Sequence, residues 1–92
     1  MGESPVRRRV RASGRVQGVF FRDSVRSRAS SRGVAGWVRN CSDGSVEAVF
    51  EGPEDAVSAM VEYCRGGPGS ASVEQLDVES EEPEGLSGFD VR

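Results

Sequence analysis

The sequence has no histidine and no lysine, and it has only two cysteines in 92 residues. Without histidine, the Ser-His-Asp and Cys-His reaction schemes are excluded, and so is the usual proton carrier at neutral pH. Cys41 and Cys64 can form at most one disulfide, and without histidine they cannot make a zinc site. Any catalysis must therefore use other groups, and we expect neither a metal ion nor any other cofactor.

Long apolar runs are also missing, and none approaches the roughly 18 residues that a membrane span needs. The first residues have no apolar stretch of the kind a secretory signal needs, so we expect a cytoplasmic protein that binds no membrane. Hydrophobic residues make up 36% and charged residues 29% of the chain, which is typical of a globular domain. We expect a single domain over residues 1–92, with residues 1–5 flexible, because the length is too small for two domains.

Charge is divided along the chain, although the net charge is only −3. Residues 1–46 hold ten arginines against three acids, which gives +7, whereas residues 47–92 hold two arginines against twelve acids, which gives −10. This division suggests that the first half handles an anionic ligand. The run Arg7-Arg8-Arg9-Val10-Arg11 alternates along a predicted strand, so we expect much of it on a solvated face and no nucleic acid as a partner.

Apolar and polar residues alternate in three segments, which predicts strands. The segment before the Asp43-Gly44 turn is also predicted as a strand, and a short segment with two inward side chains closes the chain. In two other segments apolar residues recur every three or four positions, which predicts helices, and Gly33 follows the end of the first. Asp43 and Gly44 favour a tight hairpin turn, with Glu47 and Glu51 on the side away from the core. The predicted strands are 6–13, 34–40, 46–51, 72–79 and 89–92, and the predicted helices are 21–32 and 53 to about 65.

The order of these elements defines the fold class. A β-α-β-β-α-β sequence followed by a short closing strand is the ferredoxin-like (split β-α-β) arrangement of the α+β class, an antiparallel sheet with two helices on one face. This fold hosts many functions, so the function has to be argued from a site.

The join between the first strand and the first helix is the candidate site. Gly14 and Gly18 allow backbone amides to turn inward, and the following helix directs its free N–H groups and positive dipole end at the same space. Such a cradle suits a phosphate-sized anion, and Arg22 in the first helical turn could grip two of its oxygens. A purely structural glycine turn and a solvated arginine are the alternatives. The loop is not a nucleotide P-loop, because no Gly-Lys-Ser/Thr follows it.

Asn40 ends the second predicted strand, at the same sheet edge as the loop. Its amide can donate to a phosphoryl oxygen or orient a water but cannot take a proton, so positioning is its plausible role. The alternative is an asparagine favoured only because a turn begins there. Asp43 is interpreted as a turn residue outside the site, Cys64 as core and Cys41 as a spectator thiol.

These segments resemble the acylphosphatase family along essentially the whole chain. The likeness is carried by Gly14-Arg15-Val16-Gln17-Gly18-Val19-Phe20-Phe21-Arg22, then Gly36-Trp37-Val38-Arg39-Asn40 with Asp43-Gly44-Ser45-Val46-Glu47, then Gly52-Pro53.

The resemblance implies metal-independent hydrolysis of the carboxyl-phosphate bond of a small-molecule acylphosphate to a carboxylate and inorganic phosphate. It implies that Arg22 and Asn40 are catalytic, with Arg22 holding the phosphoryl group and Asn40 orienting the attacking water. It further implies a phosphate-binding loop whose backbone amides come from Arg15, Val16, Gln17, Gly18, Val19, Phe20 and Phe21. Inorganic phosphate or sulfate would bind there as product or analogue, and we expect a monomer.

Three other interpretations compete with this one, and the first of them is rejected. An RNA-recognition domain shares the fold, but the strand at 46–51 has acids where such a domain needs cations and stacking aromatics. A carbamoyl-phosphate-handling domain of a hydrogenase-maturation protein is closer in sequence; the end of this chain at residue 92 favours a free-standing hydrolase. An inactive anion-binding regulator is the third.

Overall fold

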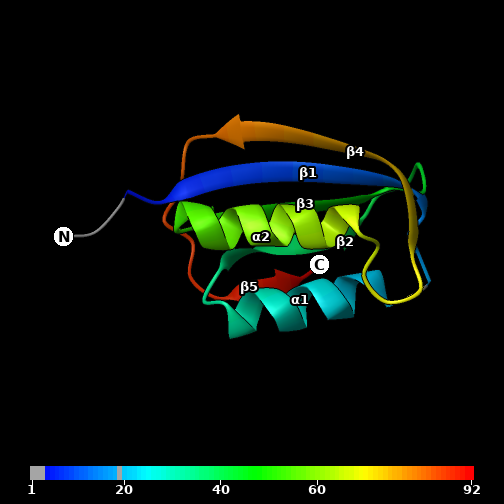
Figure 1. Cartoon of the computed structure of the whole chain (residues 1–92), viewed down its shortest axis with the longest axis horizontal. Coiled ribbons are helices and arrows are strands. Elements are labelled where there is room, and N and C mark those ends of the chain that lie inside the picture. The colour runs from blue at the N-terminus through cyan, green and yellow to red at the C-terminus, as the bar shows by residue number, and fades with distance from the viewer. Residues whose placement is uncertain (1–3, 19) are drawn as a thin grey trace.

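The fold is seen in a computed structural model that describes residues 4–18 and 20–92. The strands form one sheet in the order β4-β1-β3-β2-β5, and both helices pack against one face of it (Figure 1). The ferredoxin-like α+β prediction is therefore confirmed. The elements are β1 (Val6–Arg15), α1 (Phe21–Ser31), β2 (Ala35–Asn40), β3 (Val46–Gly52), α2 (Glu54–Arg65), β4 (Ser72–Glu81) and β5 (Phe89–Val91).

The structure differs from the prediction at one edge of the sheet. Strand β5 pairs with β2 in parallel, so the sheet is mixed, whereas all other neighbours are antiparallel. The cause is the connection after β4, which crosses from one edge of the sheet to the other along residues 82–88 (Figure 1). Of the segment 1–5 that we expect to be flexible, residues 1–3 lie outside the described part of the chain.

The hydrophobic core lies between the helices and the sheet. Each helix buries one stripe, formed in α1 by Phe21, Val25 and Ala29. Helix α2 contributes a matching stripe that includes Cys64, which is fully buried, and burial raises the pKa of its thiol to about 12. Both cysteines are free, and Cys64 is an inert core residue, as predicted.

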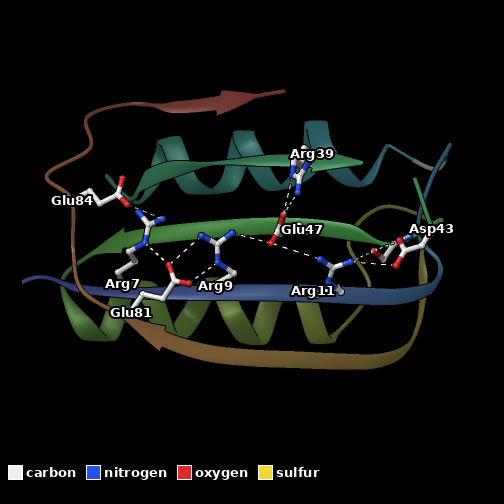
Figure 2. Close-up of polar contacts among 9 residues, drawn as sticks. Arg7, Arg9, Arg11, Arg39, Asp43, Glu47, Glu81 and Glu84 are labelled. Carbon is white, nitrogen blue, oxygen red and sulfur yellow. Dashed lines mark hydrogen bonds and ion pairs between the residues drawn. The ribbon is translucent and has the colours of Figure 1, made fainter. Parts of the chain in front are cut away.

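On the opposite face of the sheet, the prediction that the arginines of β1 are largely solvated is wrong. Arg7 is only 3% exposed, and Glu47 and Glu51, predicted to face away from the core, are 6% and 4% exposed. These side chains are buried among one another, because arginines of β1 alternate with glutamates of β3 and β4 (Figure 2). Alternation alone shows which residues share a face, but it does not show that the face is covered by ion pairs.

Two glutamates organise this charged face. Glu47 accepts hydrogen bonds from Arg9 at 2.9 Å and from Arg39 at 2.6 Å, and Glu81 accepts from Arg9 at 2.6 Å and from Arg7 at 2.8 Å (Figure 2). The hydrogen bonds from Arg9 and Arg7 lower the pKa of Glu81 from its usual 4.5 to about 2. Burial alone would raise the pKa of Glu47, but its arginine partners outweigh burial and lower it. The network therefore favours charged carboxylates.

Glu51 links this network to the crossover that positions β5. Its carboxylate accepts a 2.6 Å hydrogen bond from Arg7 and three more from the main-chain N–H groups of Glu84, Gly85 and Leu86. Burial acts to raise the pKa of Glu51, but these donors together lower it. A buried carboxylate thus holds the connection that brings β5 beside β2.

We predict that acid weakens the fold through this network. The pKa of Glu81 is depressed in the folded state, so its contribution is complete above about pH 4.5 and is lost as the pH falls towards 2. In urea unfolding, the stability difference between wild type and Glu81→Gln should shrink over that range. Glu82→Gln, an exposed neighbour, is the matched control and should change stability little at pH 7. A wild-type to Glu81→Gln difference that stays constant from pH 6 to pH 2.5 would contradict this account.

Candidate active site

A cavity of about 270 Å³ lies where the β1–α1 loop meets the ends of β2 and β5. The structure brings Arg22 and Asn40, the two predicted catalytic residues, to this one cavity. Of the predicted loop, Val16, Gly18, Phe20 and Phe21 line it, whereas Arg15 and Gln17 do not and Val19 lies outside the described residues. The full lining is Val16, Gly18, Phe20, Phe21, Arg22, Asp23, Asn40 and Val91.

Glycine is required where the loop leaves the sheet. Gly14 has a φ of 120° at a register shift between β1 and β4, and a Cβ there would come within 2.5 Å of the carbonyl oxygen of Ser72. Gly18 has a φ of 73°, a conformation that side chains rarely adopt. Between them Val16 is 1% exposed and anchors the loop in the core. The glycines therefore allow a tight turn, while the buried side chain of Val16 keeps the loop packed against the core.

The first turn of α1 points its donors at the cavity. The first helical hydrogen bond runs from the N–H of Ser24 to the carbonyl oxygen of Phe20, and no side chain caps the helix. The N–H groups of Phe21, Arg22 and Asp23 have no intrahelical acceptor, and the helix dipole adds positive potential at this end. Backbone donors and dipole together make this space favourable for an anion.

Arg22 places a guanidinium at the same cavity. The side chain is partly buried, and its Nη1 donates a 3.2 Å hydrogen bond to the main-chain oxygen of Arg92, just after β5. Within the described residues this is the only hydrogen bond of the group, so its other N–H groups remain for a ligand. The end of β5 thus orients the arginine beside the helix terminus.

The side chain of Gln17 ties the loop to the end of the β2–β3 hairpin. Its Nε2 donates to the main-chain oxygens of Cys41 at 2.8 Å and Ser45 at 2.9 Å. Cys41 directly follows Asn40, and Ser45 directly precedes Val46, the residue paired with Asn40. Sequence reasoning missed this role, because it used only the backbone of Gln17. The sequence did offer a signal for this role. Gln17 has a side-chain amide with two N–H donors and lies between Gly14 and Gly18, in a loop whose other proposed contributions come from the backbone.

Asn40 itself is exposed and is the last residue of β2, paired with Val46 of β3. The next turn is built by Asp43, whose Oδ1 accepts hydrogen bonds from the N–H and the Oγ of Ser45 at 3.0 and 2.6 Å. These hydrogen bonds lower the pKa of Asp43. Asp43 is thus a turn residue, as predicted, and it does not line the cavity.

Within residues 4–18 and 20–92, no group of three or more metal-ligating side chains lies close enough together to hold a metal ion. No helix in this part of the chain has the length and apolar character needed to cross a membrane.

Fold and site together define a small α+β domain with a candidate anion-binding cavity between its first strand and first helix. Comparison with known proteins assigns the family, because residues 8–91 match the Acylphosphatase family. An acylphosphatase of Haloquadratum walsbyi is 54% identical over 100% of this chain and 99% of its own length. One of Haloarcula marismortui is 57% identical over 94% of each chain. The solved acylphosphatase of Coxiella burnetii superposes with a TM-score of 0.91 at 40% identity, over 97% of this chain and 94% of its own. The chain belongs to the acylphosphatase family, which consists of hydrolases.

We predict that the Gln17 amide stabilises the site as well as the fold. Gln17→Ala should lower the free energy of unfolding by about 1 to 2 kcal/mol, since two hydrogen bonds are lost. It should also weaken phosphate binding, because the loop and the hairpin end are no longer held together. Urea unfolding and calorimetric titration with phosphate measure the two effects. Gln75→Ala is the control, since Gln75 is exposed and its amide donates its hydrogen bonds to Asp77 on the same strand. Unchanged phosphate affinity in Gln17→Ala would contradict this role.

Proposed function

We propose that the protein hydrolyses small acylphosphates at the cavity described above. Water attacks phosphorus, the bond between phosphorus and the carboxyl oxygen breaks, and the products are a carboxylate and inorganic phosphate. The observation that carries the proposal is the convergence of the helix N-terminus, the guanidinium of Arg22 and the amide of Asn40 on one cavity. Membership of the acylphosphatase family supports it.

The phosphoryl group has a fitting environment in this cavity. The phosphate dianion accepts hydrogen bonds from backbone N–H groups of the loop residues that line the cavity and from the guanidinium fork of Arg22. These donors are fixed before the substrate binds, so they need no reorganisation as charge develops in the transition state. Phosphoryl transfer depends mainly on such positioning and electrostatic stabilisation. A metal ion is not needed in this scheme, because the donors and Arg22 supply the positive charge.

The attacking water is oriented by Asn40. The amide holds the water through a hydrogen bond, but it cannot remove the proton. The chain has no histidine, and we assign the proton to a non-bridging oxygen of the substrate's own phosphate. Asp23 lines the cavity and is given no part in this transfer. The proposal therefore needs neither a general base nor a covalent intermediate.

Replacing Arg22 tests the first part of the proposal. Arg22→Ala should reduce kcat/KM on benzoyl phosphate by at least about 10²- to 10³-fold, the usual cost of one preorganised charge-stabilising group. Arg22→Lys should recover little, because a point charge does not reproduce the guanidinium fork. The control is Arg26→Ala, which removes an exposed arginine one turn further along α1. Near-normal turnover by either Arg22 variant would remove Arg22 from the mechanism.

Asn40→Ala tests the second part. Turnover should fall more than phosphate affinity, because the amide acts on the water rather than on the bound anion. Phosphate release from acetyl phosphate, together with phosphate titration, separates the two effects. Asp23→Asn provides the comparison and should keep its turnover, since the proton goes to the substrate. An affinity loss that exceeds the turnover loss in Asn40→Ala, or an inactive Asp23→Asn, would contradict the scheme. A chelator should leave the wild-type rate unchanged.

A further inference from the structure

Phe20 adopts a backbone conformation that its side chain disfavours. Its φ is 63° and its ψ is 22°, which is the left-handed helical region, and among the described residues no other non-glycine residue has a positive φ. A bulky side chain in this region is strained, because its Cβ approaches the following carbonyl oxygen. Gly18, two residues earlier, takes a similar conformation without that cost. Such strain persists when the surrounding structure enforces it, and it concentrates at functional sites.

Fold stability does not account for a phenylalanine at this position. The ring is 76% exposed, whereas its neighbour Phe21 is 2% exposed and supplies the core contact. Phe20 is also the N-cap residue of α1 and makes no side-chain cap hydrogen bond. Asparagine would tolerate the conformation, and glycine would relieve the strain. An exposed and strained aromatic is therefore costly in two separate ways.

The position of Phe20 suggests what the ring contacts. Phe20 lines the cavity that Arg22 and Asn40 also line, and Val91 of β5, which is 36% exposed, lines it as well. The polar groups suit the phosphate and the water. Val16 and Phe21 are nearly fully buried, so Phe20 and Val91 offer the accessible apolar surface of the lining. When the phosphate of a substrate lies in the cradle, its acyl group must lie outside the cradle. The apolar surface of Phe20 and Val91 suits that acyl group.

We propose that Phe20 is a specificity-determining residue whose ring packs on the acyl group and favours acylphosphates with an aromatic or bulky apolar acyl group. This inference rests on the proposed function, since it takes the phosphate to occupy the cradle. Aromatic rings that pack on one another gain attraction beyond the area they bury, whereas an acetyl group covers little of a ring. The left-handed backbone conformation of Phe20 places its side chain at the mouth of the cavity before the substrate arrives.

The test compares benzoyl phosphate with acetyl phosphate in each variant, using the ratio of the two kcat/KM values. Any general effect of the loop on phosphate binding cancels in this ratio. Phe20→Gly and Phe20→Asn both suit the backbone and both remove the ring, so each should lower the benzoyl-to-acetyl ratio by about tenfold, mainly through KM. Phe20→Tyr keeps the ring and should keep the ratio. The melting temperature of Phe20→Gly should be no lower than that of the wild type, because strain is relieved.

An unchanged ratio in Phe20→Gly and Phe20→Asn would overturn the inference, and so would a ratio that falls equally in Phe20→Tyr. A clear drop in the melting temperature of Phe20→Gly would show that the ring supports the fold, which would also overturn it. These failures are distinct from failure of the proposed function. If the proposed function were wrong, the wild-type protein would release no phosphate from either substrate.

Discussion

The site depends on the attachment of the β1–α1 loop to the end of the β2–β3 hairpin. The buried side chain of Val16 fixes the loop on the core, and the amide of Gln17 bonds two carbonyl oxygens next to Asn40. The donors of the cradle and the amide of Asn40 belong to separate parts of the chain, and these contacts set their relative position. The proposed reaction needs that geometry to be in place before the substrate binds, because a displacement of about 1 Å can cost about 100-fold in rate.

The charged face of the sheet serves the site indirectly. Both helices pack on one side, and ion pairs among arginines and glutamates cover the other, where many folds place a second apolar layer. Within this network Glu51 holds the crossover to β5, and the end of β5 holds Arg22. A chain of contacts therefore runs from the buried carboxylate of Glu51 to the guanidinium proposed to bind phosphate.

Periodicity and turn chemistry predicted most of the fold, because helix stripes and the Asp43-Gly44 turn are local features of sequence. The parallel pairing of β5 was not predictable in this way, since it depends on a crossover held by distant Glu51. The burial of Arg7 was missed for the same reason, because its partners lie 44 and 74 residues away. At the candidate site, the motifs singled out Arg22 and Asn40, and the structure places both at one cavity. The Gln17 side chain and the left-handed Phe20 depend on tertiary contacts and backbone geometry.

The central claim is that the cradle and Arg22 hold a tetrahedral anion facing Asn40. A crystal structure of the protein with inorganic phosphate tests it most directly. We predict the phosphate between the N–H groups of the β1–α1 loop and the guanidinium of Arg22, with a water between the anion and the Asn40 amide. Phosphate bound elsewhere while this cavity stays empty would contradict the account.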